Sequence, residues 1–193
     1  HIGDCTMSTL FVNNLNTASG TTITIPTGKQ LVGTDINSIK APGMIVQVQS
    51  GQLDTQLTLS TNKTTQTDTG LSVTITPKYS NSKIFVIATG NTYSSIYNDN
   101  PLHRIVRTVS GTLTSIAATD YITYSQNNSG GQGGAYVQSV MDTAQSTAAH
   151  EYKVQLRSDT DGGTVYFNVN DTNNQGTTEE AQRSTIMVME IAQ

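Results

Sequence analysis

The side chains that could carry catalysis in this chain are a few histidines and carboxylates. His103 and His150 each lack a close partner ligand in the sequence, apart from Glu151 beside the second. A zinc site needs three or four nitrogen, sulfur or carboxylate ligands, commonly in closely spaced pairs. A packing or surface role is therefore the simpler interpretation of both histidines, and we expect no metal site.

Two acidic stretches match functional motifs only in part. Asp159-Thr160-Asp161-Gly162 begins like a calcium loop, but Asn170 stands where the twelfth position requires a glutamate, so a hairpin turn is predicted instead. Glu179 and Glu180 are adjacent, and adjacent side chains on an extended strand point to opposite faces. Glycoside cleavage needs two carboxyl groups that face one sugar, so a solvated loop is the simpler interpretation.

Nucleophile and phosphate motifs are also missing from the sequence. The one cysteine, Cys5, has no context that would activate a thiol, and no Gly-x-Ser-x-Gly element occurs. The glycine-rich stretch 130–134 has neither the spacing nor the lysine of a P-loop and predicts a flexible loop. We therefore expect a protein that is not an enzyme and that binds no cofactor.

Tyrosines are the better candidates for binding, because each offers a flat apolar ring and a hydroxyl at a low entropy cost. Several fall in the polar stretch 91–100 or beside the glycine-rich stretch. The alternative is packing at strand ends, which the absence of tryptophan favours over a sugar site. The candidate contact residues are Tyr93, Tyr97, Asn98, Asn127 and Tyr136.

Composition sets the class of protein that must position these residues. Only 35% of the 193 residues are apolar and 12% are charged, but Thr, Val and Ile recur in alternating runs, which indicates β-structure rather than disorder. The net charge is −4 with no basic cluster, which argues against nucleic-acid binding. No apolar run approaches the roughly 20 residues that span a bilayer, so no membrane insertion is expected. Few charges also leave strand edges that partner chains can cover.

After a first strand at 44–49, alternating apolar positions predict about eight or nine further strands separated by turns, which favours an all-β fold built as an antiparallel β-sandwich or jelly roll. The stretch 83–88 is the most apolar and is predicted to be central and buried on both faces. Stretches 154–157 and 165–169 are predicted to pair as a hairpin around the glycines of 159–163. The predicted strands are 44–49, 71–76, 83–88, 102–109, 112–117, 121–124, 135–141, 151–157, 164–170 and 184–191.

The N-terminal part has a different sequence pattern, in which short apolar stretches alternate with turn residues. These apolar stretches are too short to form a hydrophobic core of their own. The pattern predicts an extended, β-rich docking or shaft segment over 1–41, joined at Ala41-Pro42-Gly43 to a head domain over 42–193. A loose arm with some β-tendency is the alternative. The residues expected to dock are Leu10, Phe11, Val12, Ile23 and Ile25.

Several of these segments resemble a family of tail-fibre and virion structural proteins of marine phages, including phages of cyanobacteria. The most specific match is Gly70-Leu71-Ser72-Val73-Thr74-Ile75-Thr76-Pro77, and Arg104 and Arg107 lie where the family often carries an arginine pair. Further similar segments are 10–15, 22–31, 42–48 and 184–191. The resemblance implies a virion component made in the host cytoplasm, typically a homotrimer, whose N-terminal segment docks to other virion proteins.

Three functions follow as hypotheses. The first is a distal tail fibre or appendage that contacts a host surface glycan or protein, with weak single sites made useful by multivalency. The second is a capsid decoration or head-fibre protein with a purely structural role. The third, an enzyme such as a polysaccharide depolymerase, is the least favoured because no suitable carboxylate pair is present.

Overall fold

The structure, a computed structural model, describes residues 25, 27–30, 32–33, 41–95, 99–118, 132–169 and 183–193. The chain divides into two compact units, residues 1–39 and 40–193. The strands of the described residues belong to the second unit, which is called the head below. The predicted docking or shaft role of the first unit stays a prediction.

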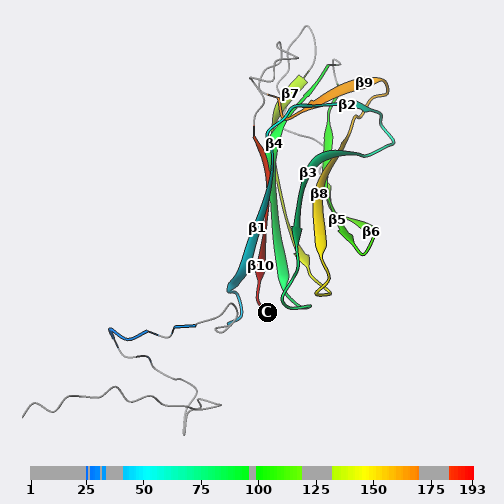
Figure 1. The fold of residues 1–193 in the computed structure, drawn as a ribbon. Coiled ribbons are helices and arrows are strands. Elements are labelled where there is room, and N and C mark those ends of the chain that lie inside the picture. Colours follow the sequence, from blue (N-terminus) through cyan, green and yellow to red (C-terminus); the bar gives the residue numbers. More distant parts are fainter. Residues whose placement is uncertain are drawn as a thin grey trace, which may run out of the picture. The chain divides into compact units, whose positions relative to one another are not determined.

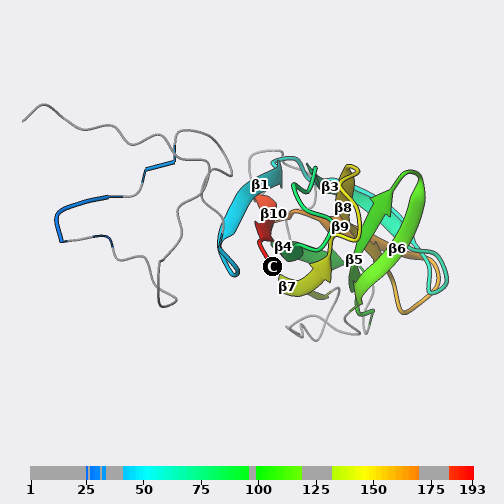
Figure 2. The same cartoon turned by 90° about the horizontal axis from the view of Figure 1, so that it is seen from below.

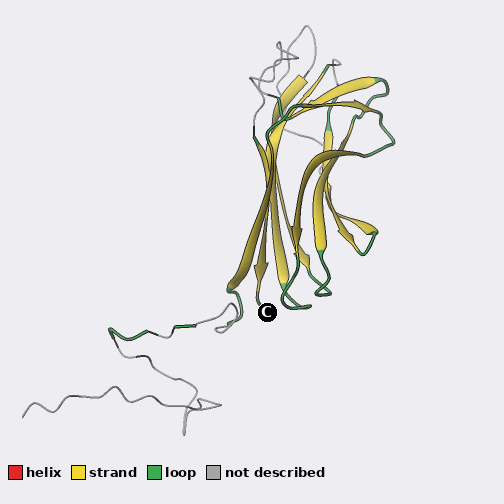
Figure 3. Cartoon of the chain, in the orientation of Figure 1, coloured by secondary structure: helices red, strands yellow, loops and turns green. Residues whose placement is uncertain are grey.

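The head is all-β, with antiparallel strands and no helix in its described residues (Figure 3). Strands form here because Thr, Val, Ile and Tyr, which suit a pleated surface, alternate with polar residues. The strands are β1 Ile45–Leu53, β2 Leu57–Thr61, β3 Thr67–Ile75, β4 Lys83–Ser94, β5 Leu102–Val109, β6 Thr112–Ala118, β7 Gln132–Thr143, β8 His150–Arg157, β9 Gly163–Phe167 and β10 Ser184–Ile191.

These strands form two sheets that face each other in a sandwich-like arrangement (Figures 1 and 2). The six-stranded sheet runs β1-β10-β4-β9-β2, and β7 pairs with β4 along that strand's other edge. β10 and β9 share one edge of β4, with β10 pairing over residues 83–89 and β9 over residues 92–94. The four-stranded sheet runs β3-β8-β5-β6.

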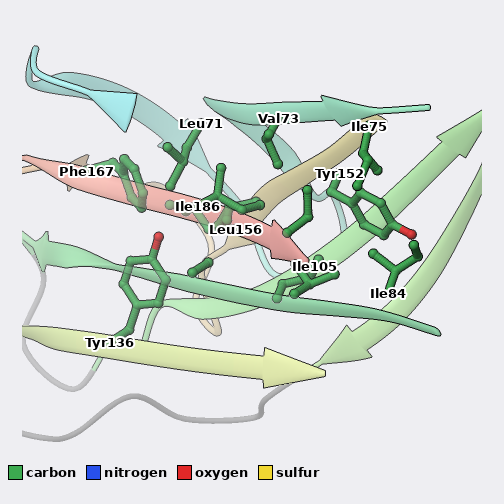
Figure 4. Close-up of a cluster of buried hydrophobic side chains, with 14 of the residues drawn as sticks. Leu71, Val73, Ile75, Ile84, Ile105, Tyr136, Tyr152, Leu156, Phe167 and Ile186 are labelled. Carbon is green, nitrogen blue, oxygen red and sulfur yellow. The ribbon is translucent and has the colours of Figure 1, made fainter. Parts of the chain in front are cut away.

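One apolar core fills the space between the sheets (Figure 4). Leu71, Val73 and Ile75 enter it from β3, and the side chains of β4 and β10 meet them from the opposite sheet. Each such side chain, once fully buried, contributes about 1.5–3 kcal/mol through removal from water. The other large, fully buried apolar side chains of the core are Ile84, Ile105, Tyr152, Leu156, Phe167 and Ile186.

A glycine lets the two sheets approach at one corner. A Cβ added to Gly51 on β1 would lie 1.9 Å from the carbonyl oxygen of Ser72 on β3. No real side chain fits at that distance, so β1 can lie against β3 only because residue 51 has none. The close contact joins the margin of the six-stranded sheet to the margin of the other.

Most predicted strands lie where the alternation placed them, and the bounds of β5 and β10 match the prediction. The predicted hairpin is wrong: β8 pairs with β3 and β5, whereas β9 pairs with β2 and β4 in the other sheet. The turn at 158–162 therefore crosses between sheets. Gly133 and Gly134 belong to β7 rather than to a loop. The predicted strand 121–124 lies outside the described residues.

Candidate assembly face

The outer face of the six-stranded sheet is apolar. In β10, the side chains of Ser184, Ile186, Val188 and Glu190 are buried, and the residues between them are only half-buried. Those intervening residues are nonetheless three apolar side chains and a threonine. Sheet faces that meet water normally carry polar side chains, so this strand has the composition of one covered on both sides.

β4 repeats this arrangement beside β10. Ile84, Val86 and Ala88 are fully buried, whereas Phe85 and Ile87 point to the other face and are half-buried. The sequence predicted that this strand is central and buried on both faces. It is central, but within the described residues only its inner face is buried.

The strand register joins these side chains into a continuous surface. Val48, Met189, Phe85 and Met141 are paired one after another across β1, β10, β4 and β7. Met187 and Ile87 form the next pair along β10 and β4. We call the whole set the apolar face, and it comprises Ile45, Val48, Phe85, Ile87, Val137, Met141, Met187, Met189 and Ile191.

The margins of the apolar face are the most open. Val137 on β7 is 69% exposed and Met141 is 52% exposed, while Ile45 and Val48 on β1 are 56% and 47% exposed. Single exposed apolar side chains are ordinary, but a contiguous set of this size marks an interaction site.

Four of the polar side chains of this face bond one another in two pairs. The hydroxyls of Thr89 and Thr185 lie 2.9 Å apart at one end of the face. At the other end Lys83 Nζ donates to Thr143 Oγ1 at 2.8 Å. These four side chains keep their hydrogen bonds when a partner excludes water from the face, which lowers the free-energy cost of burying them.

The outer face of the four-stranded sheet has the opposite character. Arg104 Nε and one of its terminal nitrogens donate to Gln155 Oε1 at 2.9 and 2.7 Å, and Gln155 Nε2 donates to Asp68. Lys153 Nζ lies 3.1 Å from a carboxylate oxygen of Glu151. This ladder of charged and amide side chains suits contact with water.

Glu190 fixes the end of β10 that adjoins the apolar face. Its buried carboxylate accepts hydrogen bonds from the backbone N–H groups of Lys78 and Tyr79, from Ser82 Oγ and from Gln47 Nε2. Burial alone would raise the pKa of Glu190, but these donors outweigh it and hold the pKa below its ordinary value. The ionised carboxylate thus ties β1 and the β3–β4 turn to β10.

A second buried carboxylate, that of Asp142, joins the two sheets on the inner side of β7. Arg107 donates to Asp142 Oδ2 at 2.7 Å, and the Tyr152 hydroxyl donates to the same oxygen at 2.9 Å. Burial first, and then the nearby Asp142 carboxylate, raise the pKa of Tyr152, so the phenol stays a neutral donor. The triad joins β7 of one sheet to β5 and β8 of the other.

Both histidines of the head are packed inside it. His103 stacks on Tyr136 with ring centroids 4.5 Å apart, and its Nε2 lies 2.8 Å from Thr92 Oγ1. Burial lowers the pKa of His103 to about 3, against the smaller opposing effect of a hydrogen bond with the backbone of Pro101. The two ring nitrogens of His150 bond the backbone carbonyls of Ala148 and Ala144.

The predicted contact residues do not gather into a site. Tyr93 and Tyr136 are 7% and 5% exposed, so both rings are buried in the head. Tyr136 belongs to the core, whereas Tyr93 is paired with Tyr166 of β9 on the other face of β4. Tyr136 packs inward because it alternates with the exposed Ala135 and Val137 along β7 and is paired with Gly90 of β4, whose missing side chain leaves room for the ring. The others, Tyr97, Asn98 and Asn127, lie outside the described residues.

The docking residues are equally untested by the described part of the chain. Ile25 is described and 44% exposed. Leu10, Phe11, Val12 and Ile23 lie outside the described residues. Their docking role stays a prediction.

Sequence reasoning missed the apolar face. The signal was present in β10, where apolar residues occupy both alternating sets of Ser184–Ile191, and in the similar run of β4. What the sequence could not reveal was which set enters the core and which set remains uncovered.

Within the described residues, no group of three or more His, Cys, Asp or Glu side chains is placed to hold a metal ion. The described part of the chain also holds no helix that could cross a membrane.

No protein-family model matches the chain, and no curated protein matches it. A functional proposal therefore rests on the geometry of the head.

Proposed function

We propose that this chain is a structural protein of a bacteriophage virion that assembles as a homotrimer and is not an enzyme. The observation that carries the proposal is the apolar face, because a chain with only 35% apolar residues places nine of them on one uncovered side of a sheet. Closure of that face by identical chains is the arrangement that a homo-oligomer requires.

The strand pairing supports a jelly-roll head. Apart from β2 and β9, the strands pair in nested order: β1 with β10, β3 with β8, β4 with β7, and β5 with β6. A ribbon of eight strands folded over in this way is the jelly-roll arrangement, which viral capsid proteins and lectins both use. The fold alone does not decide function, so it supports the virion setting only together with the sequence resemblance.

The buried carboxylates support a structural role over an enzymatic one. The Glu190 carboxylate accepts hydrogen bonds from backbone amides. The Asp142 carboxylate accepts from Arg107 and Tyr152. The Asp99 carboxylate accepts from the hydroxyls of Ser94 and Ser158. Each holds strands or turns together and faces another part of the head.

Within the virion, we propose a distal tail fibre or appendage that contacts the host surface, with residues 1–41 docked to other virion proteins. Three heads on one fibre, and several fibres on one particle, make weak single contacts effective. The contact residues that remain candidates are Tyr97, Asn98 and Asn127.

A capsid decoration or head-fibre protein with a purely structural role is the second candidate. The burial of Tyr93 and Tyr136 favours it, because two of the five candidate contact residues are thereby unavailable to a host ligand.

Two measurements test the proposal. Multi-angle light scattering of the full chain should give the mass of three copies, and a stable monomer would contradict the trimer. Binding of the assembled protein to immobilised host envelope should be saturable for a fibre tip. Its absence, with a trimer present, would favour the decoration role.

A further inference from the structure

We infer that the apolar face is covered by a second copy of this chain, with Met187 and Met189 at the centre of the contact and Met141 at its margin. It follows that oxidation of these methionines before assembly blocks assembly. The inference rests on the proposed homo-oligomer and names the surface and the chemistry through which its copies meet.

The near absence of charged side chains on the apolar face favours a partner whose contacting surface is also uncharged. Among the outward positions of β1, β10, β4 and β7, Lys83 is the one ionisable side chain, and it lies at the end of the face beside Thr143. A nucleic acid, an acidic peptide or an anionic glycan would find only this one complementary charge there, at the edge of the face. A second copy of the same apolar face or of its margin is matched in polarity.

The size of the face is sufficient for a stable contact. Four strands about 4.8 Å apart, each about eight residues long at a rise of about 3.3 Å per residue, cover a flat area of roughly 500 Å². The protruding side chains add to that area. Two copies together would therefore remove at least about 1,000 Å² from water, the lower bound for a specific interface. The face also has an apolar centre with the polar pairs Lys83–Thr143 and Thr89–Thr185 towards its ends, as protein interfaces commonly do.

Methionine suits the centre of such a contact and also makes it vulnerable. The thioether side chain is unbranched and adapts its shape to the surface that it meets. In the separate chain Met141 is 52% exposed, and Met187 and Met189 are half-buried on the outer face. Hydrogen peroxide transfers one oxygen atom to the thioether sulfur and is itself reduced to water, which leaves a polar sulfoxide. Burying that group without a hydrogen-bond partner is unfavourable.

Charge substitutions in the full chain test the location of the contact. Val137→Glu places a charge on the most exposed residue of the face, where the monomer tolerates it, and Met187→Glu places one at the centre. Thr74→Glu is the matched control, because Thr74 is exposed on β3 on the outer side of the other sheet. Circular dichroism checks that each variant is folded.

Sedimentation equilibrium should show that the wild-type chain and Thr74→Glu assemble alike. Both face variants should shift towards single chains, with the dissociation constant raised at least about tenfold by a buried unpaired charge. Assembly of Val137→Glu and Met187→Glu at wild-type strength would overturn the inference and leave the proposed trimer intact, because the copies would then meet elsewhere.

Methionine oxidation identifies the occupant of the face. Hydrogen peroxide is added to the assembled wild type and to folded Val137→Glu, with free methionine as the rate reference, and sulfoxide is located by peptide mass spectrometry. Met187 and Met189 should be protected in the assembly and reactive in Val137→Glu. Wild-type protein that is unfolded, oxidised and refolded should remain as single chains, and reduction by methionine sulfoxide reductases should restore assembly.

The remaining outcomes each overturn the inference in a different way. A monomeric wild type with protected methionines would mean that another part of the same chain covers the face. A monomeric wild type with reactive methionines would mean that the face is free or awaits a different protein. Both would also contradict the proposed trimer, whereas an assembly with fully reactive methionines would contradict only the contact surface.

Discussion

Phe85 on β4 and Met189 on β10 are paired opposite each other in neighbouring strands of the six-stranded sheet, and both side chains point away from the core. Their chain neighbours Ile84 and Glu190 form the next pair and are fully buried. The same two strands therefore serve the core with one set of side chains and present an apolar surface with the other. The proposed assembly follows from that second set.

Replacing Glu190 with Gln should destabilise the head by about 1–3 kcal/mol, because the amide cannot accept all the hydrogen bonds that the buried carboxylate receives. Chemical denaturation at one fixed protein concentration measures this, since assembly itself adds to stability. Asp161→Asn, at an exposed carboxylate paired with Lys63, is the control and should leave the free energy of unfolding almost unchanged.

The same carboxylate predicts a pH dependence. The pKa of Glu190 is lower in the folded head than in the unfolded chain, so its ionised form stabilises the fold above the ordinary glutamate pKa of about 4.3. That contribution is lost as the pH falls through the folded-state value. The stability difference between the wild type and Glu190→Gln should therefore shrink on acidification below about pH 4. A difference that stays constant to low pH would contradict this role.

Arg107→Met should destabilise the head by about 3–5 kcal/mol, because it leaves the Asp142 carboxylate in a mostly buried site without its cation. The double variant Arg107→Met/Asp142→Leu removes both charges and should recover a large part of that loss. A double-mutant cycle in urea gives the coupling energy. Strictly additive losses would show that the pair does not act as a unit.

Gly51→Ala should destabilise the head by roughly 3 kcal/mol, because the new methyl group would overlap the Ser72 carbonyl oxygen and push β1 away from β3. Gly111→Ala is the comparison: its Cβ would meet open space, but its φ of +82° strains an alanine by about 1–2 kcal/mol. Thermal unfolding of both variants ranks the two effects. Equal melting temperatures would argue against the close approach of the strands.

Removing residues 1–41 should leave a folded head, because every strand of the two sheets lies beyond residue 41. Circular dichroism of the truncated chain should keep its β-sheet signal. If residues 1–41 dock as predicted, the shortened chain should also fail to join virions in a complementation assay. Normal incorporation would refute the docking role.

The sequence by itself determined the β class and the positions of most strands, including Ser184–Ile191. It could do so because the alternation of side chains along a strand is a local property with a period of two residues. The pairing of distant strands has no such local signal. Val154–Arg157 and Val165–Phe167 look like the two arms of a hairpin, yet each joins strands of a different sheet.

Only the tertiary structure decided which apolar residues became core and which became surface. Tyr136 was a candidate contact residue but faces the core, while Met187 and Met189, although apolar, lie on the outer face. In a strand that is apolar on both sides, either set could enter the core. The choice depends on which side the β3-β8-β5-β6 sheet covers, and this is a matter of long-range packing between segments far apart in the chain.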